Sequence, residues 1–225
     1  MKAWSNMDSY AVEGLVREIK NILDRNQENA ELIPTDSDTL SQGEIIKSKL
    51  VDATKLIESN APLQMLSGYS YKDNGSLRME ANNGMYVGKV PLPKDLLRLL
   101  SVRMSGWERP AKIISELDDE YGWQSNRFGV RGNPQRPIAA VVQSNGDLQL
   151  ELYTCKTATE TLNCTYIPIP YIDNGVIFMC KKLKESILYM AASLVCTTLG
   201  DTDTASSLKS TAFELANITE PSKTQ

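Results

Sequence analysis

The acidic run ELDDEYGW, residues 116–123, is the first place where side chains could do chemistry together. Paired carboxylates serve as general acids and bases or bind hard cations such as magnesium and calcium. The spacing of these acids does not match the Asp-x-Asp-x-Asp-Gly pattern of a calcium loop, and no second acidic cluster completes a site. We therefore interpret the run as a solvated loop. Its carboxylates belong to Glu116, Asp118, Asp119 and Glu120.

The sequence contains no histidine among its 225 residues. This removes the usual general base of serine and cysteine hydrolases and the commonest ligand of transition metals. The cysteines form no C-x-x-C pair, which argues against zinc, so we interpret them as reduced, buried thiols of a cytosolic protein. A contact between Cys155 and Cys164 across a hairpin is the alternative. We expect no catalytic residue, no metal and no cofactor. The four cysteines are Cys155, Cys164, Cys180 and Cys196.

Basic and aromatic residues alternate in the middle of the chain, which makes a third candidate site. Such interleaving can stack on single-stranded bases, but Trp, Tyr and Arg also dominate the hot spots of protein interfaces. The net charge is −4, so we favour protein contact and keep a nucleic-acid-binding module as the alternative. The arginines are Arg98, Arg103, Arg109, Arg127, Arg131 and Arg136, and the aromatic residues are Tyr121, Trp123 and Phe128.

Helices are predicted at both ends of the chain, on either side of the segment that contains the acidic run and the basic and aromatic residues. Apolar residues at helical spacing predict helices over residues 9–26 and 41–59, and Pro62 lies just beyond the second. The same period returns from Leu183, with Gly200 as the residue that ends the helix, and a last helix is predicted around 204–216. We expect the four helices to pack together.

The sequence pattern of residues 69–172 predicts a β-region. Turn sequences such as DNG, NNG and SNGD separate short apolar runs, and LQLELY, residues 148–153, alternates apolar and polar side chains. The predicted fold class is α+β: N- and C-terminal helices form a bundle with an inserted antiparallel β-sandwich or small barrel. The predicted parts are residues 1–68, 69–172 and 173–225. No stretch approaches the roughly 20 apolar residues of a membrane helix, so we expect no membrane partner, and the N-terminus does not resemble a secretory signal.

Two longer segments carry a resemblance to a known family. VPLPKDLLRLLSVRMSGWERP, residues 90–110, places a strand before an LP-x-D turn, with LRLLSV and a tryptophan after it. CTYIPIPYIDNGVIFMCKKLKESILYMAASLVCTTLG, residues 164–200, is similar to a closing strand followed by a long helix rich in Leu and Ala. In this order they resemble the tail adaptor, or head–tail connector, proteins of short-tailed, podovirus-like phages. The resemblance covers roughly residues 84–200.

The resemblance implies a structural virion protein and no enzyme. Such proteins form a ring, usually of twelve copies, that binds the portal protein, joins it to a tail tube or nozzle protein and lines the channel through which DNA leaves. Genomic DNA would pass without sequence-specific binding. The protein would lie at the head–tail junction of the virion after assembly in the cytoplasm of the bacterial host. Another phage tail completion or hub protein is the alternative within this class.

This interpretation assigns residues to three surfaces. A portal-facing surface or ring interface would contain Leu208, Phe213 and Leu215. A tail-facing loop would contain Trp123, Phe128 and Arg131. The interface between subunits would contain Ile45, Ile46 and Leu50.

Overall fold

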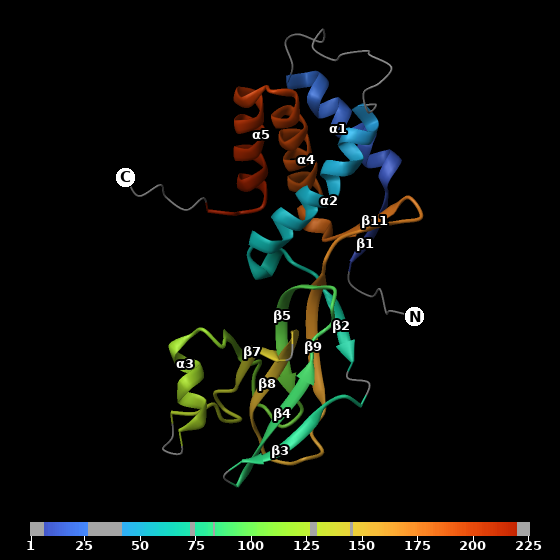
Figure 1. Cartoon of the computed structure of the whole chain (residues 1–225). Coiled ribbons are helices and arrows are strands. Elements are labelled where there is room, and N and C mark those ends of the chain that lie inside the picture. The colour runs from blue at the N-terminus through green and yellow to red at the C-terminus, as the bar shows by residue number, and fades with distance from the viewer. Residues whose placement is uncertain are drawn as a thin grey trace, which may run out of the picture. The chain divides into compact units, whose positions relative to one another are not determined.

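The computed structural model describes residues 7–26, 42–72, 75–82, 84–126, 130–144 and 146–219 (Figure 1). The chain divides into two compact units. Gly68–Pro168 forms a β-unit, and Asn6–Ser67 together with Ile169–Gln225 forms a helical unit. The predicted α+β class, with helices from both ends of the chain and a β-region inserted between them, is confirmed. The predicted parts met after residues 68 and 172, whereas the compact units meet after residues 67 and 168.

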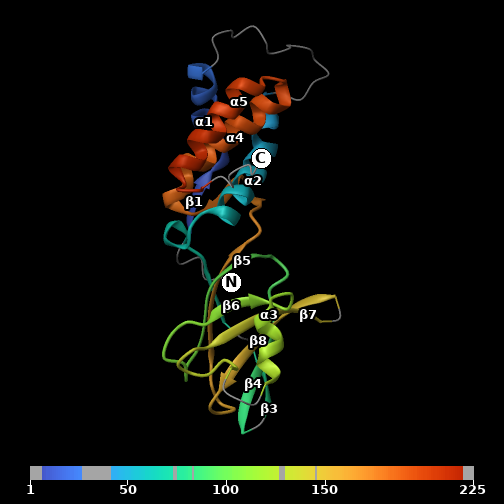
Figure 2. The ribbon, with the colours of Figure 1, turned by 90° about the vertical axis from the view of Figure 1, so that its left-hand side faces the viewer.

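The described residues of the helical unit form four α-helices. The central one, α4, packs against each of the other three (Figures 1 and 2). Its buried residues lie on all sides of the helix. A helix that is apolar all round belongs in a core. Gly200 ends α4 as predicted, with a φ of 87° that favours glycine. The helices are α1 (Val12–Asn26), α2 (Gln42–Asn60), α4 (Lys184–Leu199) and α5 (Thr202–Leu215).

A small sheet completes the helical unit. It has the order β1 (Asp8–Ala11), β11 (Val176–Met179) and β10 (Ile172–Asp173), with antiparallel pairs throughout. The first predicted helix began at residue 9, but residues 8–11 form a strand because they pair with β11. Two short 3-10 helices, η2 (Leu63–Met65) and η4 (Lys181–Leu183), also belong to this unit.

Two facing sheets make up the described part of the β-unit. One has the order β2-β9-β5 and the other the order β3-β4-β8-β7-β6. Buried residues of both sheets share one apolar cluster, so the unit is a sandwich. The sheet is not wholly antiparallel as predicted, because β6 and β7 run parallel. The strands are β2 (Tyr69–Lys72), β3 (Arg78–Asn82), β4 (Met85–Pro91), β5 (Leu96–Met104), β6 (Lys112–Ser115), β7 (Ile138–Ser144), β8 (Asp147–Cys155) and β9 (Leu162–Pro168).

Residues 90–110 contribute five buried side chains to the core of this sandwich: Val90, Leu92, Val102, Met104 and Trp107. They contain the end of β4, a turn, β5 and Trp107, whose side chain is only 2% exposed. The indole Nε1 of Trp107 donates a hydrogen bond to the Thr154 carbonyl at 2.9 Å, which satisfies its one polar group. The tryptophan of the quoted segment is therefore a core residue.

A short helical segment covers part of the outer face of the five-stranded sheet. It consists of α3 (Asp119–Gly122) and the 3-10 helix η3 (Trp123–Ser125) (Figure 2). Tyr121 from α3 packs against a second apolar cluster on that face.

Candidate functional site

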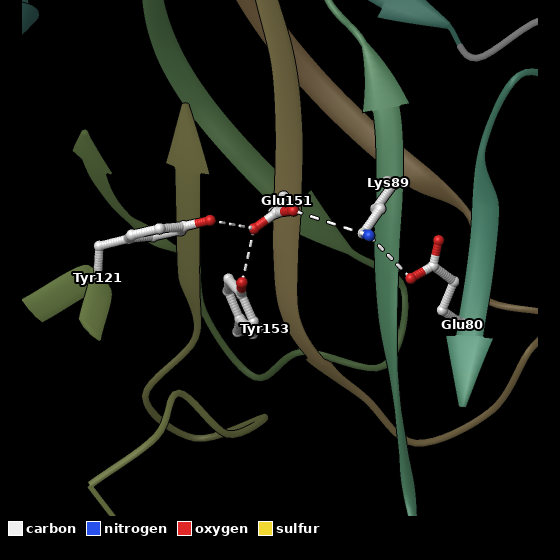
Figure 3. Close-up of polar contacts among 5 residues, drawn as sticks. All are labelled: Glu80, Lys89, Tyr121, Glu151 and Tyr153. Atoms are coloured by element: carbon white, nitrogen blue, oxygen red, sulfur yellow. Dashed lines mark hydrogen bonds and ion pairs between the residues drawn. The ribbon is translucent and has the colours of Figure 1, made fainter. Parts of the chain in front are cut away.

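A row of polar side chains crosses the outer face of the five-stranded sheet, with Glu151 of β8 at its centre (Figure 3). The Oε2 atom of Glu151 accepts hydrogen bonds from the hydroxyls of Tyr153 at 2.6 Å and Tyr121 at 3.1 Å. Its Oε1 atom lies 3.9 Å from Nζ of Lys89 in β4, and that ammonium lies 2.8 Å from Oε2 of Glu80 in β3. The row therefore ties α3 to three neighbouring strands.

The electrostatics of the row favour binding and positioning over proton transfer. Burial, followed by the nearby Glu151 carboxylate, raises the pKa of both Tyr121 and Tyr153. The hydrogen bond to Glu80 raises the pKa of Lys89. A general acid or base works best with a pKa near the working pH, and these shifts move all three groups away from neutrality. The phenols remain donors, and Lys89 remains a cation.

A shallow depression of about 410 Å³ adjoins this row and shares Lys89 with it. Four strands and their loops supply its lining at one end of the sheet, next to the part that α3 covers. The lining is rich in hydrogen-bonding groups and includes Ser76, Arg78, Lys89, Ser144, Asp147 and Gln149.

The residues assigned to the tail-facing loop have three different positions. Trp123 lies in η3 and is 48% exposed. Arg131 is partly buried, with its Nε and Nη2 atoms inside the fold. Phe128 lies outside the described residues. Of the three, only Trp123 is shown as a large apolar side chain open to a partner.

The segment that carries Trp123 is held by its buried neighbour Gln124. The amide of Gln124 accepts from the Gly132 backbone N–H at 2.9 Å and donates to the Glu120 carbonyl at 2.9 Å. Leu117 and Val130 on the same stretch are 89% and 50% exposed. A fixed segment with exposed apolar side chains is typical of a protein contact surface.

The acidic run lies at the surface, as predicted, but it is not a loop throughout, because α3 begins at Asp119 within it. Glu116 accepts from the Gln143 backbone N–H at 3.1 Å, and Glu120 forms an ion pair with Lys112. Within the described part of the chain, no three His, Cys, Asp or Glu side chains are grouped to hold a metal.

Two of the central arginines bind their own loops. Arg103 donates to the Trp107 carbonyl at 3.1 and 3.2 Å, and Arg109 donates to the Gln135 carbonyl at 2.6 Å. Guanidinium groups used in this way stabilise the turns beside β5 and β6. This observation does not favour the nucleic-acid alternative for these two residues.

Two of the residues assigned to a subunit interface belong to the core of the helical unit. Ile46 and Leu50 in α2 are 0% exposed, so they are not available to a neighbouring subunit. Only Ile45 of that group is partly exposed. The apolar pattern of α2 reflects packing within the chain, and we withdraw the two buried residues from the interface.

The residues assigned to the portal-facing surface also include both buried and accessible side chains. Leu208 is 3% exposed and belongs to the core, so it is also withdrawn. Phe213 is partly exposed, with the Lys209 ammonium 5.3 Å from its ring centre, and Leu215 is 38% exposed. Phe213 and Leu215 remain accessible on α5.

Sequence reasoning missed an exposed apolar segment in the helical unit. Ile169, Tyr171 and Ile172 are 40%, 46% and 36% exposed within four consecutive residues. The signal was present in IPIPYI, where prolines keep the chain out of a regular strand. It was interpreted as part of the closing strand, but β9 ends at Pro168.

The described cysteines are all free and buried. Burial raises the pKa of both Cys155 and Cys164 to about 12, so each is a neutral thiol at physiological pH. Cys155 lies in β8 and Cys164 in β9, two strands of different sheets. They therefore do not face each other in one hairpin.

In a comparison with known proteins, no protein-family model and no curated protein matches the chain. None of the described helices is long and apolar enough to cross a membrane.

Proposed function

We propose that this chain is a structural virion protein that forms an adaptor ring between the portal and the tail of a short-tailed phage. In this proposal it has no enzymatic activity and binds no cofactor. The ring contains about twelve copies, as its resemblance to tail adaptors implies, and lines the channel through which DNA leaves.

The inserted sandwich is the observation that supports this proposal most. The segments that carry the resemblance contribute the end of β4, β5, most of β9 and α4. The resemblance implies the same order: a strand, a β-region, a closing strand and a long helix. The side chains with raised pKa values also support a role in contact rather than catalysis, because tyrosine and thiol groups that stay protonated are poor nucleophiles.

The exposed apolar residues define the surfaces that the proposal needs. A closed ring requires two different surfaces on each subunit, because neighbours meet head to tail. Ile169, Tyr171 and Ile172 supply one of them against a sister subunit, in place of the buried residues of α2. Phe213 contacts the portal, and Trp123 contacts the tail component.

Electron microscopy of the chain mixed with its candidate portal tests the ring directly. A ring of twelve 25.0 kDa subunits has a mass of about 300 kDa, which mass photometry separates from a trimer or hexamer expected of a hub protein. Tyr171→Ser should shift the mass distribution toward single subunits.

Portal capture tests the contact assigned to α5. Phe213→Asp places a charge on the contact and should weaken capture at least tenfold. Ser210→Asp is the matched control, because it adds the same charge at an exposed position of α5. Equal capture by both variants and the parent chain, or a single copy of the chain in intact virions, would overturn the proposal.

A further inference from the structure

The depression on the five-stranded sheet contains an unusual pair of cations. Arg78 of β3 and Lys89 of β4 are directly opposite each other in the register of the two strands, and both line the depression. Like charges placed directly opposite across a pair of strands are destabilising unless something neutralises them. Arg78 is exposed and Lys89 is partly buried, and an acidic partner at either position would offset the repulsion.

Only one of these cations has acidic partners within the described part of the chain. The Lys89 ammonium lies 2.8 Å from a Glu80 oxygen and 3.9 Å from a Glu151 oxygen. No ion pair or hydrogen bond joins the Arg78 guanidinium to a described residue, although Glu80 lies two positions along the same strand. An unfavourable local arrangement, such as two like charges of which one has no acidic partner, is common at binding sites.

We infer that this depression is a binding site for a phosphate group, with Arg78 as its main contact. A guanidinium presents parallel N–H donors that match two phosphate oxygens. Ser144 and Gln149 add hydroxyl and amide groups at the end of the sheet, where hydroxyls of an attached sugar would lie. The volume of about 410 Å³ lies within the range of small-molecule clefts.

The surrounding charges limit how much negative charge the site accepts. Asp147, which lines the depression, lies 3.8 Å from Lys94, and the Glu151 carboxylate is at the centre of the neighbouring polar row. One phosphate group therefore fits better than a run of them. The group belongs either to a free phosphate ester or to the backbone of a nucleic acid, and this inference does not depend on the adaptor function.

Calorimetry and amide NMR spectra of the ¹⁵N-labelled chain test the inference with three probes: inorganic phosphate, ribose 5-phosphate and a short thymidine oligonucleotide. Saturable binding should shift the amide signals of Ser76, Arg78 and Gln149. Arg78→Gln should weaken binding about tenfold, the range expected for hydrogen bonds to a charged group. Tighter binding of ribose 5-phosphate identifies a free ester, and tighter binding of the oligonucleotide identifies a nucleic-acid backbone.

Two further variants make the test specific. Arg17→Gln removes the same charge from an exposed position of α1 and should leave binding unchanged. Glu80→Gln removes the nearest partner of Lys89 and should strengthen binding severalfold, because it lowers the negative charge beside the site. Absence of saturable binding to all three probes, or equal weakening by Arg78→Gln and Arg17→Gln, would overturn the inference.

Discussion

Glu58 of α2 is a carboxylic acid inside the core of the helical unit, with 0% of its surface exposed. Its Oε1 atom accepts a hydrogen bond from the Cys180 backbone N–H at 2.8 Å, just before η4 begins. The Cys180 thiol in turn donates to the Ser67 carbonyl at 3.2 Å. This group of contacts joins α2 to the segment that leads into α4.

Burial raises the pKa of Glu58 from 4.5 to about 7, an effect that the Cys180 hydrogen bonds only partly oppose. The folded state therefore holds a proton that the unfolded state loses near pH 4.5. The contribution of Glu58 to stability is fully present below pH 4.5 and is lost as the pH rises to about 7. Above about pH 7 Glu58 is ionised in both the folded and the unfolded state, so the loss of stability no longer changes with pH.

Glu58→Gln should remove this pH dependence, because it keeps the shape of the side chain without an ionisable group. At pH 8 the variant should be more stable than the parent by on the order of 2 kcal/mol, and at pH 4 the two should differ little. Urea unfolding at a series of pH values measures the effect. Parallel stability curves for the two proteins across pH 4–8 would contradict the assignment.

At the scale of elements, α4 and α5 are joined by two buried hydroxyls. Ser186 of α4 donates to the Ala212 carbonyl at 2.7 Å, and Ser193 donates to the Ala205 carbonyl at 2.6 Å. The two serines are seven residues apart, which is about 10 Å along a helix, so they reach separate turns of α5. Small side chains at both positions let the helices approach closely.

Ser186→Ala and Ser193→Ala should each lower the free energy of unfolding by about 1 kcal/mol, since each removes one buried hydrogen bond. The double variant should lose about 2 kcal/mol, because contacts this far apart are usually additive. Thr198→Ala is the control, since this exposed hydroxyl bonds to Leu194 within α4 itself. If urea unfolding placed the double variant level with the control, the hydroxyls would have no part in docking α5.

Helices were more accessible to sequence reasoning than sheets because their signals are local. A repeat of 3.6 residues and an end signal such as Gly200 lie within one segment, and the predicted helices agree with α1, α2, α4 and α5 to within a few residues. Strand pairing depends on distant partners. The strand β1 pairs with residues 176–179, and nothing within residues 8–11 shows this partner.

The candidate sites could likewise be predicted only where the signal is local in the sequence. An apolar residue on a helix shows that some surface is buried, but not whether the partner is the same chain, which is why Ile46 and Leu50 were assigned to a neighbour. The polar row around Glu151 joins residues 80, 89, 121, 151 and 153, which strand register and the packing of α3 on the sheet bring together. Trp123 and Trp107 both lie among charged residues in the sequence, yet Trp123 is 48% exposed and Trp107 is 2% exposed, so local composition did not distinguish a contact residue from a core residue.

At the scale of the whole molecule, the sandwich is an insertion whose ends lie next to each other. Its first strand, β2, pairs with its last, β9, so that Tyr69 is opposite Tyr166. A side chain at Gly68 would come within 2.5 Å of the Tyr166 carbonyl, which shows how closely the incoming and outgoing chains approach. The sandwich also has its own apolar core, made of residues from both sheets.

A fragment of residues 68–168 should therefore fold by itself, because it contains every strand of both sandwich sheets and needs no long connection between its ends. Dispersed amide NMR signals and a cooperative urea transition, followed through tryptophan fluorescence to which the buried Trp107 contributes, are the expected results. A fragment of residues 68–160 is the control. It lacks β9, the central strand of the β2-β9-β5 sheet, so β2 and β5 lose their partner and the fragment should stay unfolded. Similar spectra for both fragments would mean that β9 does not hold the sandwich together, and a disordered longer fragment would mean that the helical unit is needed for it to fold.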